Sequence, residues 1–226
     1  MGLMERNSTP HLLEADGIQL TLGGRVLLSD VYLRVTTGQV VGLLGRNGCG
    51  KSTLLQAVFG TQRVADASVR VDGRRVVPAY RQPGLLSYLP QVPLLPAHLT
   101  ATGAARLLGV DVEQALAAFP ELLEQRHRPV GELSGGTARL LEVLLLLHTN
   151  TAFSLLDEPF TGVMPVHIDA LAQVIRDLKQ RKGILLTDHR YAEVLALCDV
   201  VYLLHDGRLE CLPDPLSGLR DRGYLK

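Results

Sequence analysis

The chain has 226 residues, of which 46% are hydrophobic, and its 23 basic residues are balanced by 23 acidic ones. A chain of this length buries most of the surface that its unfolded form exposes, and one domain with a lobe fits it better than two independent domains. Without net charge no global field attracts nucleic acid, so we expect no nucleic-acid partner. The three cysteines, Cys49, Cys198 and Cys211, are too few and scattered for a disulfide framework or a metal site.

No stretch of the sequence resembles a secretion signal or a membrane span. The segment from Met1 to Asp16 contains Arg6 and His11 and lacks an apolar core, so we expect no signal peptide. The longest aliphatic run, residues 143–147, is far shorter than the about 20 apolar residues that cross a bilayer. We therefore expect a cytoplasmic protein that reaches a membrane only through a partner.

The N-terminal region carries strand signals. Between His11 and Val35, apolar and polar residues alternate in short bursts, punctuated by two turn signals, Asp16-Gly17 and Gly23-Gly24. This pattern predicts an antiparallel, β-rich edge. Residues 40–44 are instead a continuous apolar run, which is typical of a parallel strand buried on both faces.

A glycine-rich loop follows this buried strand, and residues 52–59 have the pattern of a helix that ends at Gly60. The loop fits G-x-x-x-x-G-K-[ST] in the context of strand, loop and helix that this pattern needs. Its glycines let the backbone curl so that several N–H groups point into one concavity, to which the helix N-terminus adds its unpaired amides. This phosphate loop consists of Gly45, Arg46, Asn47, Gly48, Cys49, Gly50, Lys51, Ser52 and Thr53.

The phosphate loop predicts a nucleoside triphosphate as ligand. Lys51 is expected to reach the β- and γ-phosphates, and the Ser52 hydroxyl to ligate Mg²⁺. The alternative is a glycine-rich turn that only caps a structural helix. Kinases, GTPases and motor ATPases share this loop, so it indicates the ligand class and not the reaction.

The middle of the chain changes from strands to helices. Strands are expected at residues 67–71, 75–77 and 85–89, the first two joined by the hairpin signal Asp72-Gly73. Residues from about 93 to 149 predict a small helical lobe instead. Its helices are expected at 101–108, 112–119, 121–126 and 137–148.

Within this lobe, a signature turn, Leu133-Ser134-Gly135-Gly136-Thr137, leads into the longest expected helix. A serine followed by two glycines at a helix start can form a second anion-binding N-terminus. Taken alone, a Ser N-cap with a flexible lead-in explains the same residues. A protein with two such sites far apart in sequence can contact one phosphate from both sides.

Two carboxylates, Asp157 and Glu158, stand at the exit of a core strand expected at 153–156. Open α/β sheets present ligand-binding groups at this end of their strands. Asp157 is expected to hold the Mg²⁺ shell, and Glu158 to deprotonate an attacking water. A charged boundary between a strand and a loop is the alternative. Further along, a helix, a strand, a helix and a hairpin are expected at 165–181, 183–187, 191–197 and 200–210.

The alternation of strands and helices predicts an α/β protein with the phosphate-loop (P-loop) NTPase fold. We expect a mostly parallel sheet core, an antiparallel β edge and the inserted helical lobe. One domain is expected over residues 1–226, with the α/β body at about 1–92 and 150–226 and the lobe at about 93–149.

These motifs together resemble one family, the ATP-binding cassette (ABC) ATPases. The phosphate loop, Gln91, the signature turn, Asp157-Glu158 and His189 follow one another in the order and at the approximate spacing of that family, over essentially the whole chain. Residues 158–163 and 186–198 look most like the ATPases of lipopolysaccharide export and branched-chain amino-acid uptake.

The resemblance implies a role for each matching residue. Gln91 looks like the loop glutamine that contacts Mg²⁺ and water and senses a membrane partner, and His189 like the histidine that contacts the γ-phosphate. Ser134, Gly135 and Gly136 are similar to the signature residues that bind the γ-phosphate held by an opposing subunit. The implied ligands are ATP and Mg²⁺.

Three positions depart from the family pattern. Leu22 stands where an aromatic residue usually stacks on adenine, and Thr137 where the signature often has Gln or Glu. Met164 occupies the place of an Asp that usually crosses the dimer interface. The resemblance therefore implies intact hydrolysis chemistry with altered nucleotide selectivity and altered coupling between subunits.

The resulting hypothesis is an ATPase subunit that homodimerises around two ATP·Mg²⁺ and drives a separate integral membrane permease. An ABC-type ATPase that regulates or remodels a partner without transport is the main alternative. A stand-alone phosphate-loop kinase is a further alternative, but it leaves the signature turn unexplained.

Overall fold

The computed structural model describes residues 10–64, 67–76 and 78–224. The predictions made for the first nine residues, and the expected end of a strand at Val77, lie outside this part of the chain. Ten strands in the described part form two sheets. The N-terminal strands form a four-stranded antiparallel sheet of β2 (Arg25–Thr36), β1 (Leu12–Leu22), β4 (Ser68–Val71) and β5 (Arg74–Arg75), in this order.

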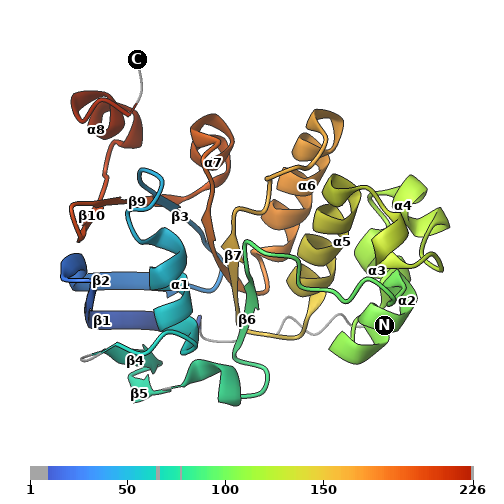
Figure 1. Ribbon diagram of the computed structural model, residues 1–226, viewed down its shortest axis with the longest axis horizontal. Coiled ribbons are helices and arrows are strands. Elements are labelled where there is room, and N and C mark those ends of the chain that lie inside the picture. Colours follow the sequence, from blue (N-terminus) through green and yellow to red (C-terminus); the bar gives the residue numbers. More distant parts are fainter. Residues whose placement is uncertain (1–9, 65–66, 77, 225–226) are drawn as a thin grey trace, which may run out of the picture.

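A six-stranded sheet forms the centre of the molecule (Figure 1). Every pairing in it is parallel except that of its last hairpin, as the sequence predicts. The sheet contains β10 (Arg208–Cys211), β9 (Val200–His205), β3 (Val40–Leu44), β8 (Gly183–Thr187), β7 (Phe153–Asp157) and β6 (Leu86–Leu89), in this order.

The central strands alternate between two hydrophobic cores because successive side chains of a strand point to opposite faces. In β3, Val41 and Leu43 belong to the core shared with the antiparallel sheet, whereas Val40 and Leu44 belong to the core on the other face. Both faces are therefore covered, which explains why these strands read as continuous apolar runs.

Eight α-helices are present in the described part of the chain. The body contains α1 (Lys51–Phe59), α6 (Pro165–Leu178), α7 (Tyr191–Leu197) and α8 (Pro215–Asp221). The lobe contains α2 (Ala101–Leu108), α3 (Val112–Leu116), α4 (Pro120–Glu124) and α5 (Gly135–His148). Short 3₁₀ helices, η1 (Ala79–Arg81) and η2 (Val130–Glu132), precede β6 and α5.

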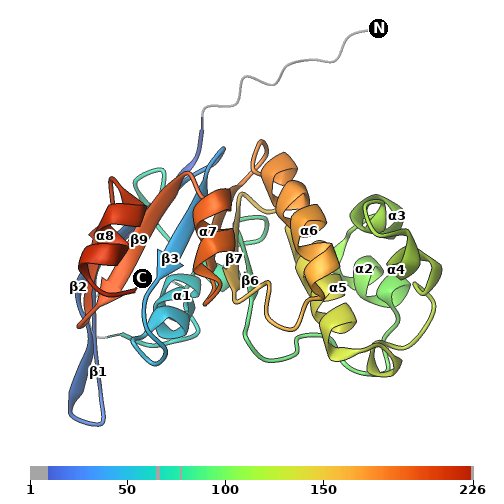
Figure 2. The same cartoon turned by 90° about the horizontal axis from the view of Figure 1, so that it is seen from above.

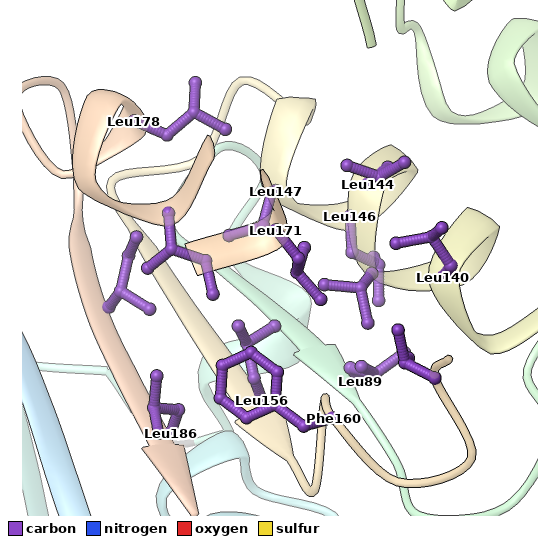
Figure 3. Packing of buried hydrophobic residues seen from close by; sticks show 14 of the residues in the cluster. Leu89, Leu140, Leu144, Leu146, Leu147, Leu156, Phe160, Leu171, Leu178 and Leu186 are labelled. Carbon is purple, nitrogen blue, oxygen red and sulfur yellow. The ribbon is translucent and has the colours of Figure 1, made fainter. Parts of the chain in front are cut away.

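The two faces of the central sheet are covered by different helices. On one face, α1 places Leu54, Leu55 and Val58 in a core that contains strands of both sheets. On the other face, α5 and α6 pack their leucines against β6, β7 and β8 (Figure 3). Residues 139–147 of α5 are all buried, in keeping with a sequence that is apolar nearly all round.

The helices α2, α3 and α4 lie at one end of the molecule, and β1 and β2 lie at the other (Figures 1 and 2). A bridge between Thr100 and Pro129 joins the start and the end of this helical segment. Leu116, Phe119 and Leu122 of the segment share one hydrophobic cluster with α5 and α6. This shared core supports our proposal that the lobe is an insertion within a single domain.

One local prediction was wrong, and one helix was missed. Asp16-Gly17 is not a turn, because it lies inside the continuous strand β1, where the register with β2 shifts between Ala15 and Ile18. A bulge uses the left-handed φ of Gly17 without reversing the chain. Helix α8 was not predicted, although the Asp214 side chain caps it and Pro215 occupies its first turn. Among the described helices, none combines the length and hydrophobicity needed to span a membrane.

Candidate functional site

The phosphate loop holds a conformation that only its glycines allow. Gly48 and Gly50 have φ of 74° and 112°, in the left-handed region that side chains disfavour. A Cβ on Gly50 would also lie 3.1 Å from the Leu27 side chain. Gly50 is the N-cap of α1 and has no side chain with which to cap it. The first amides of this helix are therefore available to an anion.

The Lys51 side chain spans the phosphate loop. Its Nζ donates hydrogen bonds to the carbonyl oxygens of Gly45, at 2.8 Å, and Arg46, at 3.2 Å. Lys51 is 7% exposed, so the ammonium sits at the floor of the loop and not in bulk solvent. This placement puts one fixed positive charge beside the helix N-terminus.

A hollow of about 530 Å³ opens over the loop, and it collects residues from distant parts of the chain. Gln91 follows β6, Glu158 follows β7 and His189 follows β8, so all three stand at the carboxyl edge of neighbouring parallel strands. This edge is where open α/β sheets bind ligands. The hollow is lined by Leu27, Asn47, Gly48, Gly50, Lys51, Ser52, Thr53, Gln91, Glu158 and His189.

Asp157 is buried beneath this hollow, at 1% exposure. Burial raises the pKa of its carboxyl group, while the nearby Ser52 hydroxyl opposes that shift. The Tyr88 hydroxyl donates to Oδ2 at 3.4 Å, whereas Oδ1 finds no hydrogen-bond partner among the described residues. A buried carboxylate oxygen left without a partner, beside a hydroxyl, fits a ligand pair for a hard cation such as Mg²⁺.

Glu158 faces the hollow from a strained backbone position. Its φ is 54°, a left-handed value that is uncommon for a residue other than glycine. Its Oε2 accepts a hydrogen bond from the Thr161 hydroxyl at 3.1 Å and lies 3.8 Å from Nδ1 of His189. The carboxylate and the imidazole are thus close enough to act on one small group between them.

Sequence reasoning missed Asp188, which is buried at 1% exposure next to His189. Its Oδ2 accepts the Phe160 amide at 3.0 Å, and its Oδ1 accepts the Arg190 amide at 3.1 Å and lies 3.5 Å from Nδ1 of His189. Burial raises the pKa of this carboxyl group as well. Asp188 therefore ties the loop after β7 to the loop after β8. Its signal in the sequence is a carboxylate beside a histidine at a strand exit.

The signature turn lies outside the hollow, since none of the lining residues comes from it. The Ser134 hydroxyl caps α5 by accepting the Thr137 amide at 3.1 Å. A Cβ on Gly135 would meet nothing within 4 Å, whereas a Cβ on Gly136 would lie only 2.0 Å from the carbonyl oxygen of Gly162. Gly135 is thus open to an approaching molecule, and Gly136 packs against the loop that follows Glu158.

Leu22 ends β1 at the hairpin tip, is 49% exposed and does not line the hollow. A second hollow of about 460 Å³ adjoins the first and shares Leu27, Asn47 and Gly48 with it. Two aromatic rings from the C-terminal part of the chain, His205 and Tyr224, line this second hollow. Arg46 and Cys49 of the phosphate loop line it too.

The profile of the ABC transporter family matches residues 28–161, which is more than half of the chain. The chain belongs to the ABC transporter family. The match includes the phosphate loop, Gln91, the signature turn and the carboxylate pair, so the resemblance stated from the motifs is confirmed.

Individual ABC proteins support the same assignment. A probable ABC transporter ATP-binding protein of Azorhizobium caulinodans is 35% identical over 219 residues, covering 91% of this chain and 78% of the relative. The lipopolysaccharide export system ATP-binding protein LptB of Acidithiobacillus ferridurans is 32% identical over 227 residues, covering 91% and 94%. A solved ATP-binding subunit of an ABC transporter superposes with a TM-score of 0.78 at 26% identity, covering 94% of both chains.

These similarities confirm both the P-loop NTPase fold and the ABC ATP-binding subunit as the class of this protein. The family relation makes ATP the nucleotide expected at the phosphate loop. It does not assign roles to single residues, which rest on the geometry above.

Proposed function

We propose that this protein hydrolyses ATP as a homodimer that encloses two ATP·Mg²⁺ and drives a separate membrane permease. One observation carries the proposal. The hollow unites the phosphate loop with Gln91, Glu158 and His189, while the signature turn of the same chain stays outside it. Each chain thus provides an incomplete site together with the surface that can complete the site of another copy.

Binding of the triphosphate follows from the loop. The amides at the start of α1 face the phosphates, and Lys51 exchanges its bonds to the Gly45 and Arg46 carbonyls for bonds to the β- and γ-phosphates. Ser52 and Asp157 would hold Mg²⁺, with Gln91 as a third oxygen donor from the hollow. The metal, when bound, neutralises the charge that develops on the phosphate oxygens.

Hydrolysis is an in-line attack of water on the γ-phosphorus. Glu158 takes the proton of the water as its oxygen bonds to phosphorus, and the bond to the ADP oxygen breaks. His189 contacts the γ-phosphate, and its Nδ1 lies near Asp188 and Glu158, which favours Nε2 as the nitrogen that faces the phosphate. Catalysis here consists of positioning and charge neutralisation.

The signature turn binds the γ-phosphate held by the opposing copy. Ser134 and the amides of Gly135 and Gly136 form the start of the 14-residue helix α5, whose dipole favours an anion. The free space at Gly135 allows the close approach that this contact needs. Because both helix N-termini contact one phosphate, ATP stabilises the dimer by mass action, and hydrolysis releases it.

A surface next to Gln91 suits the permease. Val92, which directly follows Gln91, and Leu94, two residues further on, are 66% and 37% exposed, so the loop presents apolar side chains beside a residue of the hollow. The names of the relatives link them to ABC transport and to lipopolysaccharide export. We place the protein on the cytoplasmic side of the membrane, held there by its permease.

The dimer is tested with Glu158→Gln, which keeps the side-chain shape and removes the base. Given ATP·Mg²⁺, this variant should accumulate as a dimer of two 226-residue chains on size-exclusion chromatography. Adding Ser134→Arg, which places bulk and charge in the signature turn, should return it to a monomer that still binds ATP. A Glu158→Gln chain that is saturated with ATP and remains monomeric contradicts the shared site.

The transport role is tested by purifying the tagged chain from detergent-solubilised membranes. We expect an integral membrane protein to co-purify, and to be lost when Val92→Asp charges the apolar loop. Recovery of only a water-soluble partner would favour the alternative, an ABC-type ATPase that regulates or remodels a protein without transport.

A further inference from the structure

A buried ion pair on α5 contacts the backbone at Pro90 and at Glu158. Arg139 is 8% exposed, although arginine is rarely buried. Its guanidinium donates hydrogen bonds to the carbonyl oxygen of Pro90 at 2.7 Å and to the carbonyl oxygens of Asp157 and Glu158. These three oxygens lie in two separate places, one just after β6 and the other where β7 ends and its following loop begins.

The second member of the pair is Glu142, which is 3% exposed. Its Oε2 accepts a hydrogen bond from Arg139 at 3.3 Å. Its Oε1 accepts the backbone amides of Leu94 and Leu95, at 2.6 and 3.0 Å. Both carboxylate oxygens are thus used, one within α5 and one on the loop that carries Gln91.

Stability alone is a weak reason for such a pair. Removing two charges from water costs more than their attraction often returns, and apolar residues of similar size are frequently as stabilising. A planar guanidinium with several fixed donors is, however, well suited to hold carbonyl groups in one relative orientation. The pair therefore fixes geometry between α5 and the loops that it contacts.

The backbone that this ion pair holds includes Glu158, the strained residue of the site. Glu158 has a φ of 54°, and such values persist only where the surroundings impose them. Arg139 bonds the carbonyl groups on both sides of the Glu158 Cα, through Asp157 and Glu158. The same guanidinium is bonded to Pro90, directly before Gln91. A shift of the 90–95 loop therefore acts on the guanidinium that holds Glu158.

We propose that Arg139, supported by Glu142, is a positioning residue that makes the orientation of Glu158 depend on the position of the 90–95 loop. This inference rests on the proposed function, because it assumes that Glu158 is the base. When the loop lies as it does here, the pair holds the backbone of Glu158 in its left-handed conformation. Displacement of the loop breaks the hydrogen bonds of the pair to Pro90, Leu94 and Leu95, and the backbone of Glu158 is then held less firmly. Hydrolysis is slowed, while the nucleotide stays bound.

The kinetic test is Arg139→Lys, which keeps the charge and loses the planar set of donors. We expect kcat for ATP hydrolysis to fall about 10–100-fold, while the Kd of a fluorescent ATP analogue changes less than about threefold. The matched control is Lys182→Met, since Lys182 is another buried cation, 4% exposed, at the opposite end of the sheet. Its kcat should stay within about twofold of the native value.

A loss of affinity equal to the loss of kcat, or an unchanged kcat in Arg139→Lys, overturns the proposal and leaves the ATPase assignment intact. An equal fall of kcat in the Lys182→Met control also overturns it, because the effect would then follow from any lost buried charge.

A second readout needs no nucleotide. Glu142 holds the Leu94 and Leu95 amides, so Arg139→Lys should speed hydrogen exchange at these two amides about tenfold or more, whereas Lys182→Met should not. Unchanged exchange at both amides contradicts the link between the pair and the loop. If the native chain itself hydrolyses no ATP, the proposed function fails, and this exchange experiment still decides whether the pair connects loop and helix.

A third readout reports the connection with nucleotide bound. The chain has no tryptophan, so Val92→Trp introduces a single reporter at an exposed position of the loop. In an otherwise native chain, ATP·Mg²⁺ should shift its emission. Adding Arg139→Lys should abolish the shift while ATP still binds. A shift that persists in the double variant overturns the proposal.

Discussion

The phosphate loop and the signature turn are both glycine-rich segments that precede a helix, yet the structure builds them differently. The phosphate loop needs its glycines for backbone conformation, since Gly48 and Gly50 have left-handed φ. The signature turn has a conventional cap, because Ser134 has a φ of −62° and accepts the Thr137 amide. Its two glycines matter instead because they lack a side chain. The space beside Gly135 stays open, and Gly136 packs closely against Gly162.

The surroundings of the two segments differ as well. The phosphate loop is enclosed by groups from its own chain, including Gln91, Glu158 and His189. The signature turn contributes to no part of that hollow. A segment folded against polar groups of its own chain can bind a ligand within that chain, whereas a capped helix start with open space in front can contact only what another molecule presents.

The largest expected effect comes from mixing two inactive variants. Lys51→Met disables the phosphate loop and Ser134→Arg the signature turn, so each pure variant should lose about 10²-fold or more of its ATPase activity. In a mixed dimer, the intact loop of one chain meets the intact turn of the other. Since random pairing restores about a quarter of the sites, mixing should recover up to about a quarter of the native rate.

The control for this mixing experiment is to add each variant to catalytically dead Lys51→Met/Ser134→Arg chains, which restores no complete site. A mixture of the single variants that stays as inactive as its components would show that the turn does not complete the site of another copy.

A smaller effect distinguishes the two glycines of the signature turn. Gly136→Ala drives a Cβ into the Gly162 carbonyl and should lower the free energy of unfolding by about 1–3 kcal/mol, the usual cost of overpacking. Gly135→Ala meets open space and should change it by less than about 0.5 kcal/mol, while weakening the ATP-dependent dimer. Urea unfolding measures the first quantity. Equal destabilisation by both substitutions would remove the distinction between packing and contact.

Asp157 offers a third comparison, because it is a buried carboxylate beside the phosphate loop, whereas Glu132 beside the signature turn is exposed. Burial raises its folded pKa above the usual 3.8, so its proton is held more tightly in the folded state. The cost of burying the charge is absent below pH 3.8 and grows as pH rises through the folded pKa.

Asp157→Asn should therefore abolish hydrolysis and yet stabilise the nucleotide-free protein at pH 7, by about 1–3 kcal/mol. The gain should disappear as pH falls towards 3.8, which urea unfolding at several pH values will measure. The control is Glu132→Gln beside the signature turn, where the side chain is 58% exposed and no gain is expected. A loss of stability at pH 7 would show that Asp157 is stabilised by its neighbours without a metal.

The smallest effect concerns the base of the nucleotide. The family resemblance puts Leu22 where a ring usually stacks on adenine, and leucine has no ring, so we expect similar affinities for ATP and GTP. Leu22→Tyr should tighten ATP binding by about 0.5–1.5 kcal/mol, the contribution of an aromatic stack. Titration with both nucleotides measures this. Since Leu22 does not line the hollow and Tyr224 lines its neighbour, a clear ATP preference in the native protein would point to the C-terminal ring instead.

Local patterns were sufficient to predict most elements of the fold. Buried strands such as β3 and β8 are continuous apolar runs, and α5 is apolar nearly all round, so their type is decided by residues close in sequence. Helix α8 and the bulge at Gly17 were missed because a cap and a turn signal have more than one structural outcome. Only hydrogen bonding to β2 decides that Gly17 bulges within a strand.

Some features of the candidate site could likewise be predicted from nearby residues, and others could not. The phosphate loop, the carboxylate pair and the family could be predicted from residue types at short, fixed spacings. The contacts by which Asp188 joins two loops and Arg139 bonds the backbone at Glu158 form only in the folded chain. The role of a buried charge depends on its partners. The carbonyl groups of Pro90 and Asp157 that Arg139 contacts, and the Phe160 amide that Asp188 contacts, lie 18 to 49 residues away along the chain, where no periodicity connects them.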